Sequence, residues 1–409
     1  ESCDWGGSES YVDYEKMYMS RHKLLRKAYE RSDFLKDKDY EIFLKEEKNW
    51  LTDYCLFMAI KNSQKGICWI DWPDELKDRH SKAVKEAEKE LETEINFYRF
   101  QQYCFTTQWR KLKKYANKKG ISIIGDVPIY VALDSSDAWA NPEMLQFDKD
   151  HNPKSVAGCP SDAFSATGQL WGNPLYDWKK LKASGYDWWV QRMKHCLELY
   201  DVVRIDHFRG FDEYYAIPYG EKTARKGEWE KGPGMDLFNT LNKKLENLHV
   251  IAEDLGFLTE SVLEMLKESG YPGMKVLQFA FDGSEDSAYL PYKYEHNCVV
   301  YTGTHDNDTT LGRDQHTAHQ NQDKGRRYMN TDASSISWDF IRICLGTIAR
   351  YAIFTVQDML KLPSEARMNT PGTPAGNWCW RFRSGELDAG MAEGLRQMTK
   401  LFGRQETDL

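Results

Sequence analysis

The chain contains 409 residues, with 55 Lys and Arg against 63 Asp and Glu, so its net charge is −8. Hydrophobic residues make up 41% of it and charged residues 29%, a composition typical of a folded globular protein and not of a disordered, collagen-like or coiled-coil chain. No stretch approaches the ~20 apolar residues that a membrane-spanning helix needs, and no basic face compensates the acidic total. We therefore expect neither a membrane nor a nucleic acid as partner.

The nine cysteines are odd in number and include no Cys-x-x-Cys pair. A disulfide framework needs an even set, and a structural zinc site needs closely spaced pairs. We expect separate reduced thiols. Together with an N-terminal sequence that lacks the pattern of a secretory signal, they predict a cytoplasmic location, or a plastid if the source is a plant.

Residues 1–118 are predicted to form a mostly helical subdomain. Over residues 81–120, apolar side chains recur at steps of three and four, the period of a helix with one buried face. These side chains are Val84, Ala87, Leu91, Ile95 and Tyr98. Gly120 is a plausible terminator of this helical stretch.

Residues 119–409 are predicted to hold the strands of a (β/α)₈ TIM barrel. Six short apolar runs alternate with helical stretches there, as expected for buried parallel strands in βαβ units. The runs are residues 121–126, 201–206, 249–254, 275–281, 298–303 and 351–358. Most end in a carboxylate, amide or histidine, where such barrels build active sites, and no glycine fingerprint indicates a doubly wound sheet instead. Six runs are two fewer than an eight-stranded barrel requires, so either two strands lie within the helical-looking N-terminal part or the chain as given begins part-way through the barrel.

The run at 201–206 ends in Arg204-Ile-Asp206-His207. Residues two apart in a strand share a face, so Arg204 and Asp206 point the same way. A neighbouring guanidinium favours the ionised carboxylate, which suits a nucleophile. The alternative is an ion pair that only holds strand ends together.

The run at 249–254 ends in Glu253 and Asp254. A carboxylic acid at a strand end beneath apolar walls can have its pKa raised enough to donate a proton near neutral pH. The alternative is that these carboxylates cap the helix that follows from Thr259.

Two further segments carry candidate site residues. His305 and Asp306 follow the run at 298–303 and suit either a divalent metal or the hydroxyl groups of a sugar. Because no second His-rich cluster completes a metal site, we favour the sugar. The loop at 158–178 is rich in turn residues and aromatic rings, including Trp171, which would serve as a lid or as a sugar platform.

Several ordered motifs indicate one family. They are Gly125-Asp-Val-Pro-Ile-Tyr-Val131, Phe164-Ser-Ala-Thr-Gly-Gln-Leu-Trp-Gly-Asn-Pro-Leu-Tyr176, Arg204-Ile-Asp-His-Phe-Arg-Gly210, Ala252-Glu-Asp-Leu-Gly256, Pro272-Gly-Met-Lys-Val-Leu-Gln-Phe-Ala-Phe281, Thr302-Gly-Thr-His-Asp-Asn-Asp-Thr-Thr310, Arg367-Met-Asn369 and Gly376-Asn-Trp378. With them the chain resembles the amylomaltase or disproportionating-enzyme family of 4-α-glucanotransferases (glycoside hydrolase family 77, α-amylase clan). The resemblance implies that 119–409 hold barrel strands 3–8, that the first two strands are missing from this chain, and that no metal or cofactor is needed.

The resemblance also implies roles for particular residues. Asp206 matches the family's nucleophile, Glu253 its general acid/base and Asp306 its third carboxylate. The positions that match substrate-contacting residues are Asp126, Phe164, Trp171, Arg204, His207, His305 and Asn377. The expected activity is transfer of α-1,4-glucan segments between malto-oligosaccharides with retained configuration. The alternatives are an amylase-like hydrolase, a truncated glucan-binding protein without activity and a metal-dependent hydrolase that uses His305 and Asp306.

Overall fold

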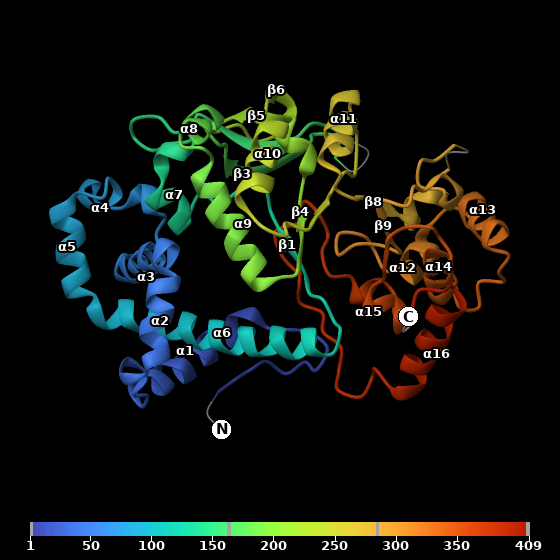
Figure 1. Ribbon diagram of the computed structural model, residues 1–409, viewed down its shortest axis with the longest axis horizontal. Coiled ribbons are helices and arrows are strands. Elements are labelled where there is room, and N and C mark those ends of the chain that lie inside the picture. Colours follow the sequence, from blue (N-terminus) through green and yellow to red (C-terminus); the bar gives the residue numbers. More distant parts are fainter. Residues whose placement is uncertain (1–2, 162–164, 284–285, 406–409) are drawn as a thin grey trace. The chain divides into compact units, whose positions relative to one another are not determined.

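The computed structural model describes residues 3–161, 165–283 and 286–405, which divide into two compact units (Figure 1). The contiguous unit is Lys23–Tyr271. The two-segment unit combines Glu1–His22 with Pro272–Leu409. Each unit contains one three-stranded parallel sheet, so the chain has an α/β fold.

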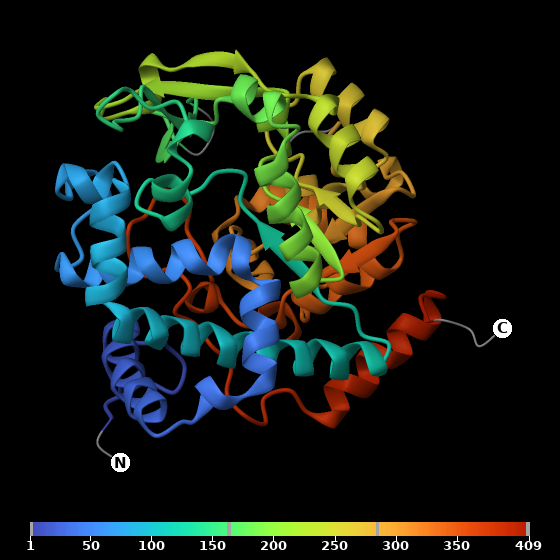
Figure 2. The ribbon, with the colours of Figure 1, turned by 60° about the vertical axis from the view of Figure 1, so that its left-hand side comes forward.

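Helices make up the first part of the contiguous unit. They are α1 (Tyr14–Glu30), which begins in the other unit, α2 (Lys38–Glu46), α3 (Lys48–Ser63), α4 (Asp74–Lys77), α5 (Ser81–Glu90) and α6 (Glu92–Lys118). The periodicity over 81–120 corresponds to α5 and α6, and Gly120 lies just beyond α6 with φ +72°. The long helix α6 packs against α3 (Figure 2), and apolar side chains in its first half, including Ile95, Phe97 and Tyr98, are buried.

A parallel sheet of order β1-β4-β7 follows in the contiguous unit. Its strands are β1 (Ile124–Val127), β4 (Val202–Ile205) and β7 (Val250–Ala252), close to the predicted positions. The connecting helices are α7 (Ser136–Ala140), α8 (Trp178–Ala183), α9 (Asp187–Leu199) and α10 (Met235–Lys244), and α11 (Glu260–Ser269) follows β7. The register pairs Asp126 with Arg204, and Ile205 with Ala252, so the carboxyl ends of all three strands meet at one edge.

The contiguous unit also holds an antiparallel sheet of order β3-β2-β5-β6 that the sequence did not predict. Its strands are β2 (Ser155–Cys159), β3 (Gln169–Pro174), β5 (Glu213–Pro218) and β6 (Glu228–Lys231). The prediction of a loop over 158–178 was therefore wrong for β3. Turn residues dominate residues 158–178, and β3 shows no apolar alternation that would predict a strand. The same is true of β6. Both strands form by pairing with neighbouring strands, β3 with β2 and β6 with β5, and a local sequence pattern does not encode such pairing.

The two-segment unit contains the second parallel sheet, of order β10-β9-β8. Its strands are β8 (Gly273–Val276), β9 (Cys298–Tyr301) and β10 (Tyr351–Ile353), and its helices are α12 (Thr310–His316), α13 (His319–Met329), α14 (Ile336–Leu345), α15 (Val356–Met359) and α16 (Ala389–Leu401). Two predicted strands were too long. The first continues as a 3₁₀ helix over Leu277–Phe281, because a buried apolar run has no period that separates strand from helix. The second stops before Thr355, whose side chain accepts a bond from Asp358 N and so caps α15.

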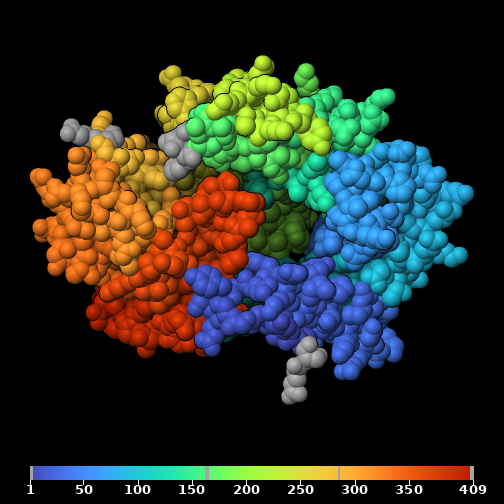
Figure 3. All heavy atoms as spheres, turned by 180° about the vertical axis from the view of Figure 1, so that it is seen from behind, coloured from blue at the N-terminus to red at the C-terminus, as the bar shows by residue number. Residues whose placement is uncertain are grey.

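Within the same unit, the segment around residues 378–381 lies against the N-terminal residues (red and blue in Figure 3). Tyr11 forms an isolated antiparallel bridge with Trp380, and the Tyr14 hydroxyl donates to the Trp378 carbonyl over 2.6 Å. These bonds fix the loop that carries Trp378.

All nine cysteines are free, as predicted. Among the residues the structure describes, no helix is long and apolar enough to cross a membrane.

Candidate active site

The first cluster of predicted site residues lies at the carboxyl edge of the β1-β4-β7 sheet. The ladder continues one residue past the strands: Asp206 N donates to the Val127 carbonyl and Glu253 N to the Ile205 carbonyl, each over 3.0 Å. Because the strands are parallel and in register, Asp126, Asp206 and Glu253 reach the same edge. The sheet thus joins three carboxylates that are up to 127 residues apart in the sequence.

Arg204 is the cation of this cluster. Its side chain is only 9% exposed, and its Nη1 donates to Asp126 Oδ1 at 2.7 Å, to Asp126 Oδ2 at 2.8 Å and to Asp206 Oδ1 at 3.0 Å. Burial by itself lowers the pKa of Arg204, but the charges of Asp126, Asp206 and Glu253 outweigh it and raise that pKa above its ordinary value. One guanidinium therefore holds two carboxylates, and the Asp206 side chain remains 43% exposed and open to a substrate.

Glu253 is held by backbone amides instead. Its Oε2 accepts a bond from His207 N at 2.7 Å and its Oε1 one from Leu255 N at 2.8 Å. Burial, and after it the negative charge of Asp206, raise the pKa of Glu253 to about 7, although Arg204 and the two amides oppose this shift. Glu253 is therefore able to give and take a proton near neutral pH.

His207 supplies one of those amides through an unusual backbone conformation. Its φ is +52°, in the left-handed region, which costs a non-glycine residue roughly 1–2 kcal/mol and turns its N–H toward Glu253. Gly210 makes room for this corner, since a Cβ there would lie 2.9 Å from His207 Cδ2. Burial lowers the pKa of His207 to about 4, and its buried Nε2 has no hydrogen-bond partner among the described residues. The His207 ring is thus neutral near pH 7.

Trp171, from β3, lies beside this cluster. Its ring meets the His207 ring edge-on at 4.9 Å between centroids, and Trp171 is 38% exposed. The indole Nε1 donates to Gln169 Oε1 over 3.2 Å. Phe164, the other aromatic predicted to contact substrate in this segment, lies outside the described residues.

The second cluster lies in the two-segment unit, just beyond β9. Asp306 Oδ1 accepts a bond from Asn369 Nδ2 at 2.6 Å, and the Asp306 carbonyl accepts one from Arg367 Nη2 at 2.6 Å. His305 Nε2 lies 3.5 Å from Asp306 Oδ2. Arg367 and Asn369 were not predicted as site residues, although the motif that they form carries part of the resemblance.

His305 and Asn377 lie around the loop that carries Trp378. The His305 and Trp378 rings are 5.1 Å apart, and Trp378 adopts a left-handed φ of +60°. The Asn377 amide is bonded within its own loop: Oδ1 accepts from Thr370 N at 2.9 Å, and Nδ2 donates to the Thr373 carbonyl at 3.1 Å. In this structure Asn377 shapes the loop, and its contact with substrate stays a prediction.

The geometry of the contiguous unit defines a class of enzyme. A carboxyl group with a pKa near 7 lies beside a carboxylate that is fixed by a guanidinium, at the carboxyl ends of parallel strands. Two neighbouring carboxyl groups, one able to donate a proton and one ionised, are typical of enzymes that act on glycosidic bonds.

Comparisons with known proteins give the particular family. A sequence profile of the family described as 4-alpha-glucanotransferase matches residues 3–387. The 4-alpha-glucanotransferase of Clostridium butyricum is 45% identical over 99% of this chain and 84% of its own, and that of Thermus thermophilus is 42% identical over 97% and 82%. The amylomaltase from Streptococcus agalactiae, solved in complex with acarbose, is 37% identical and superposes with a TM-score of 0.95 over 99% of this chain and 83% of that one. The chain belongs to the 4-alpha-glucanotransferase family, whose enzymes transfer glucan segments.

Proposed function

We propose that this protein transfers α-1,4-glucan segments between malto-oligosaccharides by double displacement at Asp206 and Glu253. The observation that carries the proposal is the contrast between the two carboxyl groups. Asp206 is bonded to a buried guanidinium, whereas Glu253 has its pKa raised to about 7. Such a difference between neighbouring carboxyl groups is what assigns nucleophile and acid in glycosidases.

In the first step, a lone pair of an Asp206 carboxylate oxygen attacks the anomeric carbon of the donor. The bond from that carbon to the glycosidic oxygen breaks, and the proton of Glu253 goes to that oxygen, so that the shortened glucan leaves with a free 4-hydroxyl group. The products are a glycosyl ester on Asp206 and an ionised Glu253.

In the second step, the Glu253 carboxylate takes the proton of an acceptor's 4-hydroxyl group, whose oxygen attacks the anomeric carbon. The ester bond to Asp206 breaks, and both side chains return to their starting states. Two inversions give net retention. Water in place of the acceptor would give hydrolysis, so transfer requires that the acceptor be bound firmly.

The other predicted residues are proposed to hold and stabilise the sugar. Asp306, fixed by Asn369, is suited to bind sugar hydroxyl groups and to stabilise positive charge at the reacting carbon. The neutral His207 and the half-exposed Trp171 are suited to contact the same chain through a hydrogen bond and through a ring face. Asp126, Arg204, His305 and Asn377 complete the proposed substrate-binding set, with Phe164.

We also propose that the six parallel strands belong to one (β/α)₈ barrel. Within each parallel sheet, strands that are hydrogen-bonded neighbours are also consecutive parallel strands in the sequence: β1, β4 and β7 in one, and β8, β9 and β10 in the other. A (β/α)₈ barrel has this strand order. A cytoplasmic or plastid location stays part of the proposal, since the relatives include bacterial enzymes and one named as chloroplastic/amyloplastic from rice.

The test is to incubate the protein with pure maltotetraose and resolve the products by chain length. Transfer gives a ladder of shorter and longer oligosaccharides. Glucose and shortened products alone would make the protein a hydrolase, and unchanged maltotetraose with retained glucan binding would make it a binding protein. With an α-maltosyl fluoride, whose leaving group needs no proton, Glu253→Gln should accumulate an ester on Asp206 that mass spectrometry of peptides detects, whereas Asp206→Asn should not.

A further inference from the structure

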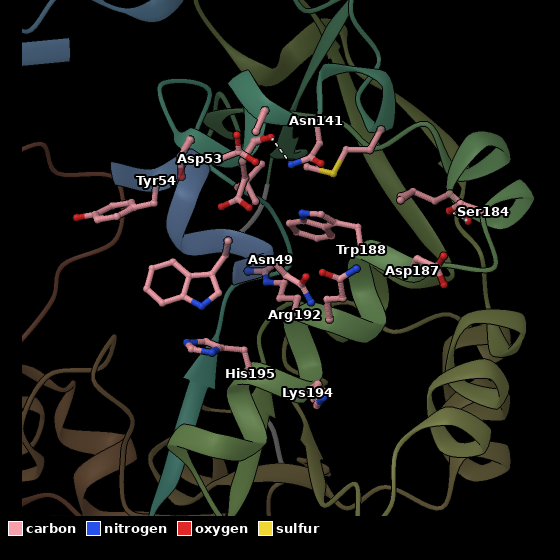
Figure 4. A pocket seen from close by; sticks show the side chains of 18 of the residues that line it. Asn49, Asp53, Tyr54, Asn141, Ser184, Asp187, Trp188, Arg192, Lys194 and His195 are labelled. Carbon is pink, nitrogen blue, oxygen red and sulfur yellow. Dashed lines mark hydrogen bonds between the residues drawn. The ribbon is translucent and has the colours of Figure 1, made fainter. Parts of the chain in front are cut away.

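A pocket lies in the contiguous unit, and the residues proposed for catalysis do not line it. It encloses about 750 Å³, within the range of small-molecule sites, and its walls come largely from α3, α7 and α9. Asn49, Trp188, Arg192 and His195 surround it (Figure 4). None of the predicted site residues lines it.

Aromatic rings form part of its wall. Trp50 on α3 and Trp188 on α9 are both partly exposed, and Tyr54 lies one helical turn beyond Trp50. Trp50 is held in place: its Nε1 donates to Glu47 Oε2 over 2.7 Å, and its ring lies 5.3 Å from that of His195. Fixed, partly exposed indole rings offer flat apolar faces of the size of a pyranose ring.

The charges around the pocket do not favour an anionic ligand. Seven Asp and Glu line it against three Lys and Arg, and four of these carboxylates are paired with cations that lie outside the lining: Glu46 and Glu47 with Arg110, Asp53 with Arg79, and Asp187 with Lys244. The guanidinium of Arg192, the one arginine in the lining, already donates hydrogen bonds to the carbonyls of Pro128 at 2.6 Å and Ile129 at 3.1 Å. Carboxylates and the exposed amides of Asn49 and Gln191 instead match the hydroxyl groups of a neutral ligand.

A divalent metal fits less well. Ligand atoms of Glu47, His195 and Glu198 lie within 4.8 Å of one another. However, both Glu47 oxygens are occupied, Oε1 by Arg110 Nη2 at 2.9 Å and Oε2 by Trp50, and the same Arg110 nitrogen lies 3.8 Å from Glu198 Oε2. A guanidinium among the ligands opposes a second cation in the same place.

We propose that this pocket is a second carbohydrate-binding site, which takes a short segment of a neutral glucan chain against Trp50 and Trp188. The preference for a neutral polyhydroxylated ligand follows from the pocket itself, whereas the choice of an α-glucan rests on the proposed function. Such a site would hold a long substrate at a second point and leave the chemistry to Asp206 and Glu253.

The experiment measures maltoheptaose binding by calorimetry in Glu253→Gln, so that the ligand is not consumed. Trp50→Ala, Trp188→Ala and the exposed-residue variant Asn49→Ala are then made in that background. The control is Tyr115→Ala, which removes a 63% exposed ring on α6 outside the pocket. We expect two classes of site, one of which weakens by about tenfold or more in each tryptophan variant and less in Asn49→Ala, while the control leaves both unchanged. Thermal unfolding by circular dichroism checks that each variant is folded.

A single class of site that none of the three variants changes would overturn the proposal. So would binding of zinc or magnesium chloride alone that Glu47→Gln abolishes, because the pocket would then be a metal site. Pocket-dependent binding by a protein that performs no transfer would reject the proposed function and leave this inference standing. Cellohexaose, a β-linked glucan, serves as the second probe. If the pocket binds cellohexaose as tightly as maltoheptaose, it is a carbohydrate site that does not select α-glucans.

Discussion

The two parallel sheets hold their acidic residues in different ways. At the carboxyl edge of the β1-β4-β7 sheet, the Arg204 guanidinium donates to the carboxylates of Asp126 and Asp206, and the carboxyl group of Glu253 has a pKa of about 7. Beyond β9, by contrast, the Asp306 carboxylate is bonded by the neutral amide of Asn369. Under the proposed function, the first arrangement sets the protonation states that covalent and acid–base steps require, and the second orients a carboxylate for binding. The following predictions test this difference.

The largest effect is expected at the first sheet. Asp206→Asn and Glu253→Gln should each lower kcat/KM for maltotriose transfer by about 10³- to 10⁴-fold, because each removes a group that changes its bonding in the reaction. Asp254→Asn is the neighbouring control and should retain most activity if the protein folds. An equal loss of kcat/KM in all three variants would contradict this prediction, because it would show that activity depends on an intact sheet edge and not on the two proposed catalytic carboxyl groups.

Asp306→Asn should have a smaller effect, about 10²- to 10³-fold, because it removes stabilisation of the transition state and no bond-making group. Asn369→Ala should have a lesser effect on the same rate, since Asp306 would lose orientation and keep its charge. Initial rates with maltotriose and an ester-trapping assay distinguish the two sheets. Loss of ester formation from α-maltosyl fluoride in Asn369→Ala, as complete as in Asp206→Asn, would contradict the distinction.

The pH dependence sharpens the comparison further. Glu253 must be protonated to act first, and its pKa is raised to about 7, so kcat/KM should fall about tenfold per pH unit above about pH 7. Arg204→Met removes the cation that opposes this shift and should move the alkaline limb to higher pH while it lowers the rate; Arg204→Lys should move it less. If the alkaline limb of the kcat/KM profile lies at the same pH in Arg204→Met as in the unchanged protein, the group that titrates there is not Glu253.

The smallest effects concern two glycines. Gly210→Ala brings a Cβ to 2.9 Å from both His207 Cδ2 and Ile129 Cδ1, and should destabilise the protein by about 1–3 kcal/mol and lower activity as the His207 corner shifts. Gly394→Ala, in α16, meets no atom within 4 Å and should raise the free energy of unfolding by about 0.5–1 kcal/mol. Chemical denaturation measures both. Equal stability of the two variants would show that the corner is not tightly packed.

Part of the first cluster was accessible to sequence reasoning, because the relation between Arg204 and Asp206 is local and the strand ends carry recognisable patterns. The Arg204-x-Asp206 spacing fixes a shared face in any strand, and apolar runs on either side predict buried parallel strands whose carboxyl ends meet. The left-handed φ of His207 has no such signal, since it is imposed by the turn after β4 and by the bond to Glu253. The support of Asp306 by Asn369 was also missed, because it joins residues 63 positions apart.

The sequence by itself determined which residues are candidates for chemistry, the helices over 81–118 and most of the parallel strands, because these follow from periodicity and residue type. Only the tertiary structure decided the antiparallel sheet, the ends of β8 and β10, the raised pKa of Glu253 and the pocket beside Trp50 and Trp188. The physical reason is that strand pairing, burial and electrostatic fields depend on which distant segments meet, and that is a property of the folded chain.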